Sequence, residues 1–222
     1  MAKWARAAGI ILFSIMIVGG LPGAASAHEE RETTFPDGSG SVPTYRTGGG
    51  QQILVCKTDQ AEFDERIAGF PTDLRERNAT LFTQCQTDGV RHVQEAVDQA
   101  SPGDRILILP GLYREEPSLT PPSGACANLQ APRAELGYLI MPYDQQVQCP
   151  HEQNLVAILG KDNLQIEGTG ASPGDVVIDA QFNKLNALRA DRADGVYLRN
   201  FTAERTTFNA VYIMETDGFV ID

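Results

Sequence analysis

A short pattern of alternating apolar residues occurs three times between residues 154 and 222, and it limits the fold more than any other feature of the chain. Its copies begin at Asn154, Asn186 and Asn209, so they lie 32 and 23 residues apart. The turn-rich segment 168–175 accounts for the longer first interval. Within each copy the apolar residues lie two apart, which places them on one face of a strand. A repeat of about 23 residues made of short strands and turns predicts a solenoid, and the alternative is an antiparallel sandwich with hairpin turns.

The first 27 residues have the layout of a secretory signal peptide. Lys3 and Arg6 precede an uncharged run over residues 7–21, and an Ala-Ser-Ala site ends at Ala27. The uncharged run is shorter than the roughly 20 residues that cross a membrane. We therefore expect cleavage after Ala27 and an exported, secreted or extracytoplasmic chain with no membrane span. Residues 28–50, rich in Gly, Pro, Ser and Thr, are expected to form a flexible leader.

The formal net charge is −11 at pH 7. A chain this acidic is a poor candidate for nonspecific binding to nucleic acid or to an anionic membrane, so nucleic acid is not an expected partner. His28 would become the new N-terminal residue, where its amine and imidazole could chelate copper. Cleavage leaves some residue at that position by chance, so we expect no metal site there.

Four cysteines lie in the exported part of the chain. An even number in an oxidising compartment indicates two disulfides, most simply Cys56 with Cys85 and Cys126 with Cys149, although four cysteines allow three pairings. Their spacing matches no zinc pattern. Residues 51–89 are thus expected to be a disulfide-tethered N-terminal segment, with a first strand followed by helical stretches.

Residues 90–115 combine the signals of a helix and a strand. Val93, Ala96, Val97 and Ala100 fall on one helical face. A Ser-Pro-Gly-Asp turn follows, and residues 105–109 form a buried-looking strand. A helix placed before the first repeat would cover the open end of an apolar interior.

The stretch VQEAVDQASPGDRILILPGLYRE, residues 93–115, resembles the N-terminal entry of right-handed parallel β-helix proteins of the pectin-lyase-like superfamily. The resemblance implies an all-β fold over residues 90–222, with three strands per coil of about 23 residues and an N-terminal capping helix. Pectate lyases, pectin methylesterases, uronate epimerases, polysaccharide hydrolases and copper-related periplasmic proteins share this architecture, so the resemblance does not select a reaction. For a lyase it implies a calcium cofactor.

Strand alternation predicts which side chains of the second and third repeats face outward. If the apolar residues point inward, then Arg189, Asp191, Tyr212 and Met214 point outward, with Arg189 beside Tyr212 in the next repeat. An arginine beside an aromatic ring suits a sugar acid, so we predict Arg189, Asp191 and Tyr212 as substrate-binding residues. The alternative is that they are ordinary residues of an exposed sheet.

The leading functional prediction is an exported protein that binds or processes an acidic polysaccharide, in the manner of a pectate lyase or a uronate epimerase. A noncatalytic extracellular binding or adhesion module is the first alternative, and a periplasmic copper-related protein is the second. No catalytic residue can be assigned, and His92 and His151 are expected to be ordinary surface or loop residues. Because the chain stops at Asp222 in mid-repeat, we expect a longer protein whose catalytic residues lie downstream, or else an oligomer that stacks through the open end.

Overall fold

The computed structural model describes residues 42–129, 133–134, 137–138 and 140–222, and side chains only outside residues 130–139. The chain divides into two compact units, Met1–Glu32 and Thr33–Asp222. The predicted signal peptide, residues 1–27, and the leader up to residue 41 lie outside the described residues. All described residues belong to the second unit.

Four α-helices, thirteen strands and three short 3-10 helices make up the described regular structure. The helices are α1 Gln60–Ile67, α2 Thr72–Asp88, α3 Val93–Gln99 and α4 Tyr143–Gln148. The strands are β1 Gln52–Val55, β2 Arg105–Ile108, β3 Gly111–Tyr113, β4 Arg133–Ala134, β5 Gly137–Tyr138, β6 Asn154–Leu159, β7 Gln165–Gly168, β8 Val176–Asp179, β9 Asn186–Asp191, β10 Tyr197–Arg199, β11 Thr202–Glu204, β12 Asn209–Met214 and β13 Val220–Ile221.

Eleven of these strands form three parallel sheets. The five-stranded sheet has the order β1-β2-β7-β10-β13, the β8 sheet has the order β11-β8-β3, and the β9 sheet has the order β12-β9-β6. Strands β4 and β5 pair with each other in antiparallel fashion. Each repeat of the sequence supplies one strand to the β9 sheet, and Asn154, Asn186 and Asn209 are aligned across it. The repeat spacing therefore fixes the register of this sheet.

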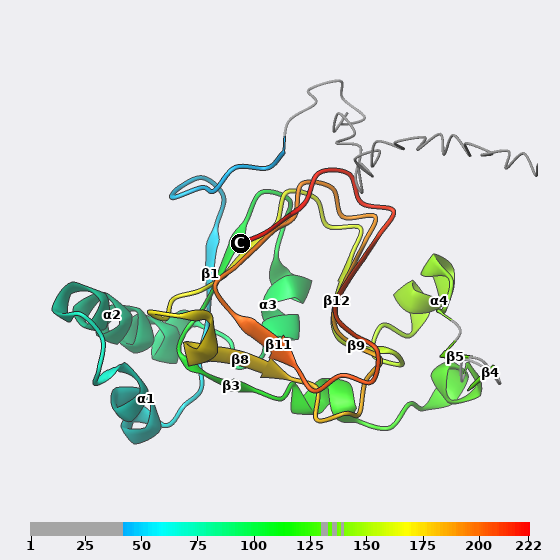
Figure 1. Cartoon of the computed structure of the whole chain (residues 1–222), viewed down its shortest axis with the longest axis horizontal. Coiled ribbons are helices and arrows are strands. Elements are labelled where there is room, and N and C mark those ends of the chain that lie inside the picture. The colour runs from blue at the N-terminus through cyan, green and yellow to red at the C-terminus, as the bar shows by residue number, and fades with distance from the viewer. Residues whose placement is uncertain (1–41, 130–132, 135–136, 139) are drawn as a thin grey trace, which may run out of the picture. The chain divides into compact units, whose positions relative to one another are not determined.

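The apolar residues of the three sheets meet in one core. Val156, Leu188 and Val211 are aligned on the β9 sheet, and the first two are fully buried. Figure 1 shows the three sheets as the sides of a triangular interior. Helix α3 contributes Val93, Ala96 and Val97 to the same core, so its apolar face is used as the sequence predicts.

One side chain of α3 completes the edge of the β9 sheet. The Gln94 amide accepts a hydrogen bond from the Ala157 N–H at 2.6 Å and donates to the Ala157 carbonyl at 3.2 Å. A buried strand edge with unpaired backbone groups would be costly. Gln94 therefore takes the place of a neighbouring strand beside β6.

Helices α1 and α2 cover the outer face of the five-stranded sheet beside β1 and β2. Leu54 and Leu107 from the sheet pack in a second core with Phe63 of α1 and Phe82 of α2, whose rings stack with centroids 4.1 Å apart. The predicted disulfide Cys56–Cys85 ties α2 to the end of β1. The second predicted disulfide joins Cys126 to Cys149. Both predicted pairings are confirmed.

The predicted fold class is wrong. An all-β right-handed parallel β-helix was expected, but the described residues combine three small parallel sheets with four α-helices, so the fold is mixed α/β. A β-helix solenoid is not shown. The predicted class followed from the repeat and did not count the helical stretches expected in residues 51–89, where α1 and α2 form a layer with its own apolar core.

Candidate functional site

The three predicted substrate-binding residues lie together but are not equally accessible. Arg189 on β9 is aligned with Tyr212 on β12, and its guanidinium lies 5.3 Å from the centre of the tyrosine ring. The Arg189 Nε donates to Asp191 Oδ2 at 3.1 Å, and Arg189 and Asp191 are only 0% and 1% exposed. Arg189 Nη1 and Asp191 Oδ1 are buried without a hydrogen-bond partner among the described residues. As it stands, this ion pair is closed to a ligand, and its substrate-binding role stays a prediction.

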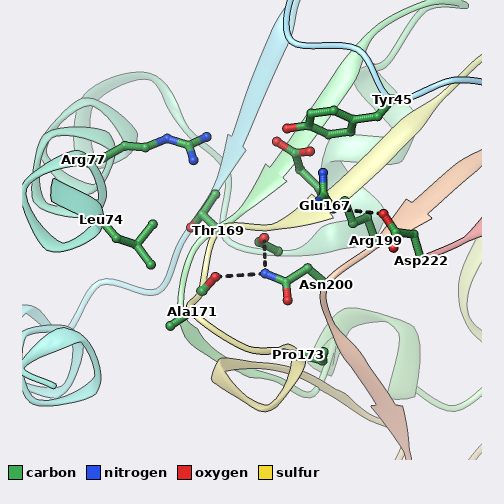
Figure 2. A pocket seen from close by; sticks show the side chains of 12 residues that line it. Tyr45, Leu74, Arg77, Glu167, Thr169, Ala171, Pro173, Arg199, Asn200 and Asp222 are labelled. Carbon is green, nitrogen blue, oxygen red and sulfur yellow. Dashed lines mark hydrogen bonds and ion pairs between the residues drawn. The ribbon is translucent and has the colours of Figure 1, made fainter. Parts of the chain in front are cut away.

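A hollow that is open to a ligand lies over a different sheet, the five-stranded one. We call it the α2 cleft: a hollow of about 450 Å³ between α2 and the outer face of the five-stranded sheet (Figure 2). Its volume is within the range of roughly 300–1,000 Å³ typical of ligand pockets. Its lining comes from the N-terminal segment, α2, β7 with the following loop, β10 and the C-terminal residue: Tyr45, Leu74, Arg77, Glu167, Gly168, Thr169, Gly170, Ala171, Pro173, Arg199, Asn200 and Asp222.

Two asparagines fix the loop at the floor of the cleft. Asn78 of α2 donates to the Thr169 carbonyl at 2.9 Å and accepts from the Thr169 hydroxyl at 2.6 Å. Asn200 donates to the carbonyls of Gly168 and Gly170, each at 2.9 Å (Figure 2). The floor is therefore held from both the helix and the sheet.

Local geometry explains the residue types at the bend beside this loop. Asn200 has a φ of 54°, which asparagine tolerates better than most residues. A Cβ on Gly168 would lie 2.0 Å from the Asn200 carbonyl oxygen. Glycine is therefore required where the loop approaches the next strand.

The acidic groups of the cleft already have cationic partners. Glu167 is buried, and its Oε1 lies 3.5 Å from Arg105 Nη2. Asp222 Oδ2 lies 3.2 Å from Arg199 Nε and accepts from the Tyr197 hydroxyl at 3.0 Å. Both carboxylates are thus neutralised by neighbours in the fold.

Tyr45 forms the wall opposite α2. The Arg199 guanidinium lies 4.4 Å from the centre of its ring, and the residue remains 38% exposed. Burial of the phenol raises the pKa of Tyr45, and the neighbouring Glu167 carboxylate raises it further. The tyrosine is therefore a neutral surface with an apolar ring and a polar tip.

Arg77 supplies the unmatched charge of the cleft. It is exposed, and it makes no ion pair or hydrogen bond with the part of the chain that the structure describes. Figure 2 shows its side chain reaching from α2 across the cleft. Since the other charges are paired, Arg77 makes the α2 cleft locally positive on a chain whose net charge is −11.

The residues of this cleft were not predicted from the sequence, although one sequence pattern indicates part of it. Glu167 and Arg199 are aligned neighbours on β7 and β10, and they are separated by the same interval as the first two repeats. Charged residues at matching outward positions could have been found in this way. Tyr45 and Arg77 come from segments outside the repeats, and no sequence signal joins them to the sheet.

His92 and His151, which were predicted to be ordinary residues rather than site residues, both lie in loops. His92 precedes α3, and its Nδ1 is 3.8 Å from Glu115 Oε1. The carbonyl of His151 accepts a hydrogen bond from Lys184 Nζ. Burial lowers the pKa of both imidazoles. His28, the remaining histidine and the copper candidate, lies outside the described residues.

The described residues contain no group of three or more His, Cys, Asp or Glu side chains that could hold a metal ion. They therefore do not fit the calcium site that the family resemblance implies. Across the same parts of the chain, no helix is long and apolar enough to span a membrane.

Comparison with known proteins adds no relative. A scan of protein families, a search of curated proteins and a search of solved structures each found no match. The resemblance to the pectin-lyase-like superfamily stays a prediction from residues 93–115.

Proposed function

We propose that the protein binds an acidic polysaccharide and holds one carboxylate-bearing sugar in the α2 cleft. The observation that carries the proposal is the unpaired guanidinium of Arg77 at a cleft whose other charges are neutralised. Arginine binds carboxylates through charge-assisted, often bidentate hydrogen bonds. A carboxylate at this place would pair with Arg77, the one free cation among the described residues that line the cleft.

The opposite wall suits a sugar ring. Tyr45 presents a partly exposed aromatic ring there, and Leu74 adds an apolar side chain on the α2 side of the cleft. Ligand sites commonly combine apolar walls with a few placed polar groups. The cleft therefore offers one face for the ring and one cation for the acid.

We propose binding rather than turnover at this place. Glu167 and Asp222 are each paired with an arginine, so neither is a free group that could transfer a proton to or from a bound sugar. This favours the noncatalytic binding module over the lyase or epimerase. The two disulfides are compatible with an extracytoplasmic protein, and we propose that the protein acts outside the cytoplasm.

The test is calorimetric titration of the full chain with hexagalacturonate, with maltohexaose as a neutral ligand of the same length. We expect binding of the acidic oligomer alone, weakened by salt. Arg77→Gln should lower the affinity roughly tenfold or more, since a hydrogen bond to a charged group contributes about 1.5–3 kcal/mol.

The matched control is Arg75→Gln, because Arg75 lies on the same helix but does not line the cleft. It should leave the affinity unchanged. Equal losses in the two variants, or equal binding of the neutral oligomer, would contradict the proposed site.

A further inference from the structure

A second hollow lies beside the same N-terminal segment that lines the α2 cleft at Tyr45. It measures about 270 Å³ and is lined by residues 42–44 and 46, the turns at Asn163 and Gly195, and the ring of Tyr197. This is smaller than the roughly 300 Å³ at the lower end of ligand pockets. By size it is better suited to extend a neighbouring site than to hold a ligand alone.

The two hollows adjoin at a pair of aromatic rings. Tyr45 lines the α2 cleft and Tyr197 lines the second hollow, and their ring centroids lie 5.9 Å apart. Tyr197 and Arg199 are two residues apart on β10, so they share the outer face of the five-stranded sheet. Both hollows therefore open over one face of one sheet.

Side chains of the sheet hold the N-terminal segment whose residues line both hollows. The Gln165 amide accepts from the Arg46 N–H and donates to the Arg46 carbonyl, both at 2.9 Å. Arg105 Nη1 donates to the Thr47 carbonyl at 2.8 Å. The backbone that follows Tyr45 is thus held on the sheet, with the Tyr45 ring in the α2 cleft beside Tyr197 of the second hollow.

The charge of the second hollow also suits an anionic ligand. Among the described residues that line it, Arg46 is the only charged one, and its guanidinium donates to the Asn163 carbonyl at 2.5 Å. Within residues 42–222, as far as the structure describes them, no acidic side chain lines it. A chain of sugar acids leaving the α2 cleft past Tyr45 would meet a second cation and no opposing charge.

We infer that the α2 cleft and the second hollow are two subsites for one linear acidic oligosaccharide, which crosses the protein at Tyr45 and Tyr197. This inference rests on the proposed function and adds to it the length and path of the ligand. Filling two linked subsites with one molecule raises affinity beyond that of either subsite.

The experiment compares galacturonate with hexagalacturonate on the full chain, by calorimetry, in wild type and three variants. Wild type should bind the hexamer at least about tenfold more tightly than the monomer. Thr44→Trp fills the second hollow, so it should reduce hexamer affinity to that of the monomer and leave monomer affinity unchanged. Val42 lines the same hollow, so Val42→Trp serves as a second variant if Thr44→Trp fails to fold.

The control is Thr47→Trp, which places the same bulk on the same segment outside both hollows. It should change neither affinity. Equal wild-type affinities for monomer and hexamer, or full hexamer affinity in both hollow-filling variants, would overturn the two-subsite inference alone. Failure of both ligands to bind wild type would overturn the proposed function and this inference with it.

Discussion

Glu115 makes the stability of the fold depend on pH in an unusual direction. Its side chain is fully buried, and its two oxygens accept hydrogen bonds from the backbone N–H groups of Val93 and Gln94 at 2.9 and 3.0 Å. Burial raises the pKa of Glu115 to about 7, although these two N–H groups and Lys57 act in the opposite direction. The nearby His92 and Glu116 complete its charged surroundings.

The sign and the size of the effect follow from linkage. The pKa of Glu115 is about 7 in the folded protein, against an ordinary value of 4.5, so between these pH values the folded state holds a proton that the unfolded chain has lost. The free energy of unfolding therefore falls as pH rises. Each unit of difference is worth about 1.4 kcal/mol, which gives about 3 kcal/mol in all and about 2.5 kcal/mol between pH 5 and pH 8.

Urea unfolding followed by circular dichroism, with the disulfides intact, measures this difference. Both the parent and Glu115→Gln should carry His92→Gln, because the lowered pKa of His92 gives the opposite pH dependence. Relative to Glu115→Gln, the parent should lose about 2.5 kcal/mol of stability between pH 5 and pH 8. Parallel pH profiles for the two proteins would refute the reasoning.

Two further substitutions test the polar contacts around the candidate sites. Asn78→Ala leaves the buried Thr169 hydroxyl and carbonyl without their Asn78 partner, and it should lower the free energy of unfolding by about 2–3 kcal/mol. The exposed Thr83→Ala on the same helix should cost less than about 0.5 kcal/mol, and equal effects in urea unfolding would contradict the role of Asn78. Arg189→Ala leaves Asp191 as a buried unpaired charge, so we expect a loss of about 3–5 kcal/mol with unchanged binding of hexagalacturonate by the folded fraction. Loss of binding at full stability would instead support the substrate-binding role predicted for Arg189.

The features that were predictable from the sequence are those encoded in local spacing. The alignment of Asn154, Asn186 and Asn209 follows from the repeat interval, and the buried face of α3 follows from its helical period. Both disulfide pairings join cysteines that are neighbours in sequence. Each of these depends on residues close to one another in the chain or related by one period.

The features that were not predictable depend on how separate segments pack. Alternation places Arg189 outside the core, but it does not say whether the side chain is covered, and Arg189 is fully buried. The α2 cleft exists because α2 and Tyr45 lie beside β7 and β10. No periodicity relates these segments, so neither the cleft nor the mixed α/β class could be read from the repeat.

The most direct test of the central claim is a crystal structure of the full chain with hexagalacturonate. The account predicts one carboxylate on the Arg77 guanidinium and one sugar ring against Tyr45, with the chain continuing past Tyr197 over the five-stranded sheet. A sugar bound instead over the β9 sheet, at Arg189 and Tyr212, would contradict it.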